Sequence, residues 1–146
     1  MNTFLKTAAL FTIVLGLAVT AFAESLPVGK WKLDSYKFGQ KIADPISKEL
    51  ITLNIDSEGK IGGLSGCNVY GGSYSFAEGK LQISEIFSTM MACEEPLMSF
   101  ERTFYETLRS SDRFTLVDGV LTITDGDAKS FVRFTRVRKP KPHNMC

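Results

Sequence analysis

Histidine and tryptophan are scarce in this chain of 146 residues, which contains one of each. Most general-base, metal-binding and nucleophilic sites use histidine, so a single histidine, His143, leaves little material for them. Charge of one sign is also lacking, because 17 basic residues stand against 16 acidic ones. Nucleic-acid-binding proteins usually carry a strong basic excess. The composition therefore predicts no nucleic-acid partner, and it offers no recognisable catalytic, metal-binding or cofactor-binding constellation.

Long apolar runs are confined to the start of the chain. Lys6 gives a positive beginning, residues 8–19 form an apolar run, and Ala21-Phe22-Ala23 places small residues where a signal peptidase reads. The run is shorter than the roughly 20 residues of a membrane-spanning helix, although an uncleaved anchor is the alternative interpretation. We expect a signal peptide over residues 1–23 and a secreted protein in the periplasm or the extracellular space.

Cysteine is also rare, with three in the chain. In an oxidising compartment, paired cysteines are expected to form disulfides. Cys67 and Cys93 lie inside the predicted folded region, whereas Cys146 is the last residue of a polar tail. We predict a Cys67–Cys93 disulfide that leaves Cys146 over. The protein is expected to be a monomer, with Cys146 able to cross-link two copies.

Eight segments alternate apolar and polar residues with the period of two that is typical of a half-buried strand. They cover residues 29–38, 49–56, 60–64, 69–76, 80–86, 113–117, 120–124 and 130–137. Short turns join most of them, which predicts antiparallel pairing. After the fifth segment, Leu97, Phe100, Phe104 and Leu108 repeat at helical spacing and predict a helix over residues 96–110. We expect a mainly β fold (α+β), with about eight antiparallel strands in a curled, barrel-like sheet and one helix inserted after the fifth strand.

The most distinctive stretch covers residues 63–74 and reads G-x-x-G-C-N-x-Y-x-G-x-Y. Residues 89–93 then read Thr-Met-Met-Ala-Cys, and Glu101 follows on the predicted helix. This combination resembles the META domain, also called the HslJ-like family, over roughly residues 27–136. The resemblance implies a small antiparallel β fold with one helix. It also implies an association with the cell envelope and with stress responses, without an established biochemical activity. We place the domain at residues 24–138 and a basic Pro/Lys tail at residues 139–146.

The motif residues are open to two interpretations. They are Gly66, Asn68, Tyr70, Gly72, Tyr74, Thr89, Met91, Ala92 and Glu101. As structural residues they would form a bent strand pair stapled by the disulfide, in which Asn68 bonds neighbouring backbone. As a binding surface, Tyr70 and Tyr74 would share one face of a strand and take an extended peptide or a sugar.

Glu101 lies beside the apolar face of the predicted helix. A buried carboxylate needs partners, so we expect an ion pair or a bond to the backbone of the motif loop. The alternative is a hydrolase that pairs Glu101 with a second carboxylate, for which the sequence offers no identifiable candidate.

A local basic patch stands near the end of this otherwise neutral chain. Its members are Arg133, Arg136, Arg138, Lys139 and Lys141. Such a run is usually just solvated, but it could also make peripheral contact with anionic phospholipid or lipopolysaccharide.

From the sequence as a whole we expect a non-enzymatic protein that acts by binding, with an envelope protein as its partner. The alternatives are a small carrier of a lipid or other apolar ligand and a protein-interaction or inhibitor module.

Overall fold

The computed structural model describes residues 25–43 and 51–138. Its elements are β1 (Gly29–Phe38), β2 (Lys41–Ala43), β3 (Thr52–Ile55), β4 (Lys60–Leu64), β5 (Val69–Ala77), β6 (Lys80–Ser88), α1 (Glu95–Ser110), β7 (Ser111–Val117), β8 (Val120–Asp125) and β9 (Phe131–Arg136). Among these residues, no helix is long and apolar enough to cross a membrane.

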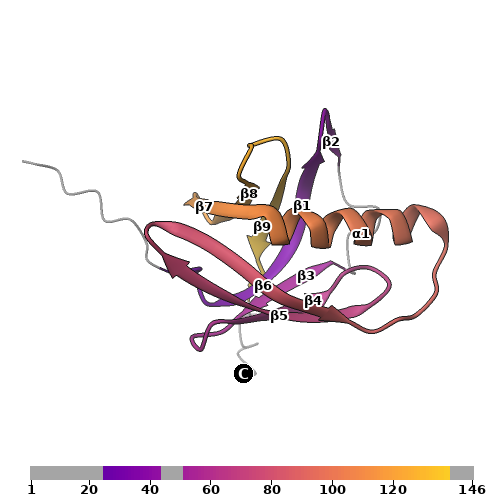
Figure 1. Cartoon of the computed structure of the whole chain (residues 1–146), viewed down its shortest axis with the longest axis horizontal. Helices are drawn as coiled ribbons and strands as arrows, with labels where there is room; N and C mark the ends of the chain where they lie inside the picture. Colours follow the sequence, from indigo (N-terminus) through magenta and orange to yellow (C-terminus); the bar gives the residue numbers. More distant parts are fainter. Residues whose placement is uncertain (1–24, 44–50, 139–146) are drawn as a thin grey trace, which may run out of the picture.

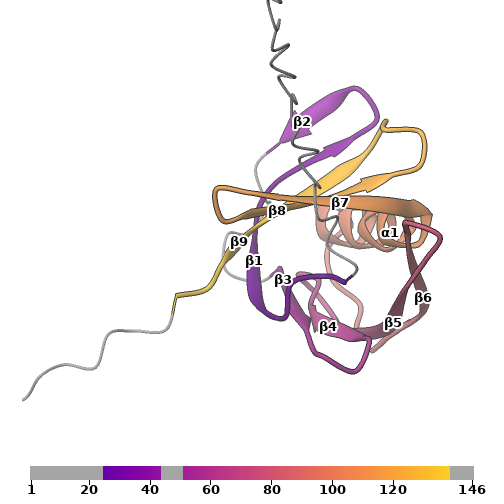
Figure 2. The same cartoon turned by 90° about the vertical axis from the view of Figure 1, so that its left-hand side faces the viewer.

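The strands form one antiparallel sheet in the order β6-β5-β4-β3-β1-β9-β8-β7, with β2 paired to β1. The sheet curls until its two end strands, β6 and β7, lie near each other (Figure 2). α1 connects these two strands, and β7 continues from its end along the same side of the molecule (Figure 1). The fold is thus a nearly closed, barrel-like sheet with one helix, which confirms the predicted fold class.

The helix follows the sixth strand of the structure, and not the fifth, because β2 is an additional strand between the first two strands that alternation predicts. β2 has three residues and folds back on β1 through a turn at Gly39, whose φ of 66° suits glycine. A three-residue strand is too short to show a period of two, so the sequence pattern could not reveal it.

One hydrophobic core lies between the concave side of the sheet and α1. Alternation along β1 buries Trp31 and Leu33, and the same pattern on β8 and β9 buries residues of those strands. The helix contributes Phe100, Phe104 and Leu108 from one face, as their spacing predicts. Helix formation is favoured by Pro96 in the first turn and by Glu95 near the positive end of the helix dipole.

Candidate functional site

Asn68 is the centre of a hydrogen-bond cluster that joins three segments of the motif. Its side-chain Oδ1 accepts hydrogen bonds from the Thr89 hydroxyl and from the Met91 backbone N–H, both at 2.8 Å. Its Nδ2 donates to Glu101 Oε1 at 2.6 Å. One buried amide therefore ties the β4–β5 connection to the β6–α1 connection and to the helix. This arrangement agrees with the structural interpretation of the motif.

Glu101 is buried in the same cluster, with 6% of its surface exposed. Its Oε2 accepts hydrogen bonds from the Ser65 hydroxyl and from the Asn68 backbone N–H, the latter at 3.0 Å. The carboxylate thus bonds the backbone of the motif loop, which is one of the two partners expected for Glu101 from the sequence. The other expected partner was a cation, and Glu101 forms no ion pair among the described residues.

Ser65 and Tyr105 complete the cluster on the side of the core. The two hydroxyl oxygens lie 2.7 Å apart, and Ser65 also contacts the Asn68 carbonyl oxygen at 2.9 Å. Burial raises the pKa of the Tyr105 phenol, so it remains a neutral donor. A serine beside a carboxylate resembles part of a hydrolytic site, but Ser65 is fully buried and no substrate can reach it in this conformation.

A disulfide joins Cys67 and Cys93, which are 26 positions apart in the chain. It links the same two connections that Asn68 ties, so Ala92 and Met91 are held from both sides. We call this combination of the disulfide and the Asn68 hydrogen bonds the loop clamp. Among the motif glycines, Gly66 has a φ of 104°, and a Cβ there would lie 2.5 Å from Leu97 Cδ1. Glycine at this position therefore permits both the turn and the close approach of α1.

Tyr70 and Tyr74 do not form an accessible aromatic surface. Tyr70 is 3% exposed, packs against Phe104, and donates its hydroxyl to the Thr52 carbonyl at 2.9 Å. Tyr74 is half-buried against the core and donates to the Asp56 carbonyl at 2.9 Å. Both side chains share one face of β5, as predicted, but that face is the concave one, so a peptide or sugar has no access to Tyr70.

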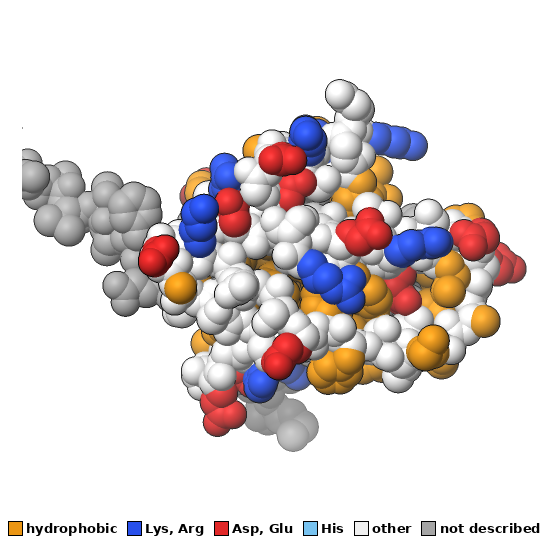
Figure 3. All heavy atoms as spheres, viewed as in Figure 1, with side chains coloured by type: hydrophobic (Ala, Val, Ile, Leu, Met, Phe, Trp, Pro, Cys, Tyr) orange, Lys and Arg blue, Asp and Glu red, His pale blue; other side chains and the backbone are white. Residues whose placement is uncertain are grey.

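Some exposed apolar residues lie on the opposite, convex face of these strands or in the loop after them. Five of them, on β4, β5, β6 and the following loop, are Leu64, Val69, Phe87, Met90 and Met91. Figure 3 shows hydrophobic side chains over β6 and the segment leading to α1. Phe87 lies across Gly71 of the neighbouring strand, a contact that a side chain at Gly71 would block.

The predicted basic patch is divided by the structure. Arg136 lies 4.9 Å over the Trp31 ring and donates to the Val28 carbonyl at 3.0 Å, so it helps to hold the start of β1. Arg138 is exposed just after β9. Arg133 projects from the middle of β9 with its guanidinium 4.9 Å over the Phe131 ring. Lys139, Lys141, His143 and Cys146 lie outside the described residues.

Sequence reasoning did not assign a role to three lysines that flank Arg133 on the outside of the barrel. Lys30 and Lys32 alternate with the buried Trp31, and Lys37 stands between Tyr36 and Phe38, whose rings pack on the core. The alternation of the sequence could have identified two of these lysines, because Lys-Trp-Lys on a half-buried strand places both lysines outward.

We call Lys30, Lys32, Lys37 and Arg133 the cationic face. It is continuous because β1 pairs with β9, with Ser35 opposite Arg133. Within residues 25–43 and 51–138, the ion pairs are Arg113–Asp112 and Lys129–Asp127, and none involves these four cations. The acid nearest along β1 is Asp34, which sits at the strand's irregularity and accepts a bond from the Ser35 hydroxyl.

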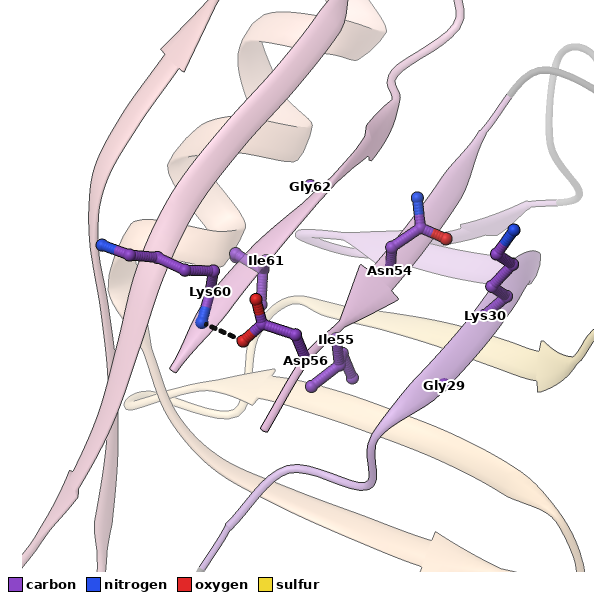
Figure 4. Close-up of a pocket in the computed structure, with 8 residues that line it drawn as sticks. All are labelled: Gly29, Lys30, Asn54, Ile55, Asp56, Lys60, Ile61 and Gly62. Atoms are coloured by element: carbon purple, nitrogen blue, oxygen red, sulfur yellow. Dashed lines mark hydrogen bonds between the residues drawn. The ribbon is translucent and has the colours of Figure 1, made fainter. Parts of the chain in front are cut away.

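An open groove of about 450 Å³ lies between β1, β3 and β4. It is lined by Gly29, Lys30, Asn54, Ile55, Asp56, Lys60, Ile61 and Gly62. Figure 4 shows Lys30 and Asn54 rising on the same side of the sheet, while the Lys60 side chain extends away across β5. Lys30 therefore belongs to both the groove and the cationic face.

Comparison with known proteins gives a family and a fold. An NMR structure of a protein from Burkholderia xenovorans has a TM-score of 0.64 and 23% identity, covering 95% of this chain and 100% of that one. A crystal structure of a DUF4847 family protein from Bacteroides vulgatus has a TM-score of 0.53 and 14% identity, covering 82% and 97%. No curated protein matches. The family model of the META domain matches residues 24–138, and the chain therefore belongs to the META domain family.

Proposed function

We propose that this protein is an exported, non-enzymatic binding protein of the cell envelope, and that its cationic face binds the phosphate groups of an anionic lipid surface. The observation that carries the proposal is the set of four outward cations on two paired strands, without an ion pair among the described residues. Their position, rather than the net charge of a nearly neutral chain, supplies the attraction.

The geometry of the sheet suits contact with several phosphates at once. Successive outward residues on one strand are about 6.8 Å apart, and paired strands lie about 4.8 Å apart. The four side chains therefore spread over an area that more than one lipid headgroup can meet. Each Lys or Arg near an anionic membrane contributes about 1 kcal/mol, and salt screens this contribution.

The non-enzymatic part of the proposal is supported by the environment of the motif residues. Their polar groups are used inside the protein: Glu101 and Asn68 bond each other, and Ser65 is buried beneath them. Export is supported by the signal-like segment over residues 1–23 and by the disulfide. Intact mass of the protein from the periplasmic or culture fraction tests export, with Glu24 expected as the first residue.

Sedimentation with lipid vesicles tests the cationic face. We expect the protein to bind vesicles of phosphatidylcholine and phosphatidylglycerol at low salt, and to release as salt increases. The double variant Lys32→Glu, Arg133→Glu should bind at least about tenfold more weakly, because it reverses two of the four charges. Lys80→Glu, Arg102→Glu makes the same charge change at exposed positions elsewhere and is the matched control. Equal loss in both variants would contradict the proposal.

A further inference from the structure

We propose that the groove between β1, β3 and β4 binds a phosphorylated sugar, with Lys30 contacting the phosphate and Asn54 and Asp56 contacting the sugar hydroxyls. This inference rests on the proposed function, because it specifies which headgroup the anionic surface presents. A volume of about 450 Å³ lies within the range of small-molecule sites, roughly 300–1,000 Å³, and suits one or two sugar rings.

The groove offers an ammonium group, a side-chain amide and a carboxylate. Lys30 supplies an ammonium group that forms no ion pair within the described part of the chain. Asn54 is exposed, and its side-chain amide, which can both donate and accept, forms no hydrogen bond within the described residues. These two side chains stand side by side because Lys30 and Asn54 are direct partners in the β1–β3 ladder.

Asp56 supplies an acceptor that is fixed in place. Its Oδ1 accepts hydrogen bonds from the backbone N–H groups of Glu58 and Lys60, both at 2.8 Å, so the carboxylate is held at the turn between β3 and β4 (Figure 4). Within the described residues, Oδ2 accepts no hydrogen bond and remains available for a hydroxyl. A fixed carboxylate would repel a ligand made of phosphate alone, whereas it suits the uncharged, hydroxyl-bearing part of a sugar phosphate.

The floor of the groove suits the carbon face of a sugar ring. Gly62 places no side chain between Asn54 on β3 and Gly71 on β5, its partners in the sheet. Ile55 and Ile61 also line the groove although both are almost fully buried, and most of the lining surface is apolar. The ammonium group, the amide, the carboxylate and the apolar floor together match a ligand that is anionic at one end and polyhydroxylated at the other.

NMR titration of the purified protein tests this inference with three probes: glucose 1-phosphate, glucose and inorganic phosphate. We expect glucose 1-phosphate to shift the backbone amide signals of Gly29 and Gly62 and the side-chain amide signal of Asn54 in a saturable manner. Glucose and phosphate alone should need at least about tenfold higher concentrations for the same shifts.

Two substitutions separate the two ends of the ligand. Asn54→Ala should weaken binding of glucose 1-phosphate, whereas Gln82→Ala, an exposed amide on β6, is the matched control and should leave it unchanged. Lys30→Gln should make the affinities for glucose and glucose 1-phosphate nearly equal. The thermal midpoint of each variant shows that it is folded.

Each other outcome overturns the inference in a defined way. Equal affinity for inorganic phosphate and glucose 1-phosphate would show that the groove recognises charge alone. Shifts confined to residues outside the groove, or none at 50 mM probe, would show that it holds no sugar. If the titration fails but vesicle binding still depends on Lys32 and Arg133, the proposed function stands without this inference. If the titration succeeds but vesicle binding does not depend on Lys32 and Arg133, the proposed function is contradicted and the sugar phosphate site stands by itself.

Discussion

Replacing Glu101 with glutamine keeps the size of the side chain but forces an NH₂ group into a site built for two acceptors. Glu101 Oε2 faces the Ser65 hydroxyl and the Asn68 backbone N–H, and Oε1 faces Asn68 Nδ2. In either orientation, the glutamine NH₂ therefore meets a donor. Asn68 cannot rotate its amide to accept, because its Oδ1 is held by the backbone N–H of Met91.

The expected cost follows from the hydrogen bonds that are lost. A hydrogen bond to a charged group contributes about 1.5–3 kcal/mol, and a buried donor left without a partner costs about 1–3 kcal/mol. We expect Glu101→Gln to lower the free energy of unfolding by about 2–3 kcal/mol. For a domain of this size, that loss lowers Tm by roughly 10 °C.

Urea and thermal unfolding followed by circular dichroism measure this effect. Glu106→Gln is the matched control, because this substitution removes the same charge on the exposed side of the same helix. The control should differ from the unmodified protein by less than about 0.5 kcal/mol. A Glu101→Gln variant as stable as this control would refute the reasoning, and the buried cluster would then need a role other than stability.

Two further predictions concern the disulfide and the buried phenols. In a Cys146→Ser background, reduction of the Cys67–Cys93 disulfide should lower the free energy of unfolding by about 3 kcal/mol, measured from urea curves with and without reductant; overlapping curves would contradict it. Burial raises the pKa of Tyr70 and of Tyr105, so the folded protein keeps their protons above pH 10, where the unfolded chain releases them. The stability that these neutral phenols contribute is complete below about pH 10 and declines as the pH rises further. Urea unfolding at pH 9, 10 and 11 should show this decline, and Tyr70→Phe should reduce its slope; an unchanged slope would contradict the assignment to Tyr70.

Most of the fold could be predicted from the sequence because its elements are long and strongly patterned. The alternation around Trp31 and the helical spacing of Phe100, Phe104 and Leu108 depend on burial against a single core, and both appear in the structure. β2 could not be predicted, because three residues beyond a turn at Gly39 carry no periodic signal.

The candidate site was less accessible to sequence reasoning, because a strand pattern shows which residues share a face without showing which side is concave. Tyr70 and Tyr74 share a face as expected, yet that face is the core side. The cationic face joins Lys32 on β1 to Arg133 on β9, about a hundred positions later in the chain. Such a juxtaposition depends on the order of strands in the sheet, which local patterns do not contain.

The loop clamp has a consequence for any partner that meets the exposed segment around Met90 and Met91. Met90 is 97% exposed, yet the neighbouring Met91 is held through its backbone N–H by Asn68, and Cys93 is covalently attached to Cys67. Fixing the backbone of a free loop on association costs about 1–2 kcal/mol per residue in conformational entropy. Here that ordering takes place when the protein folds, so the apolar side chains meet a partner on a framework that is already rigid.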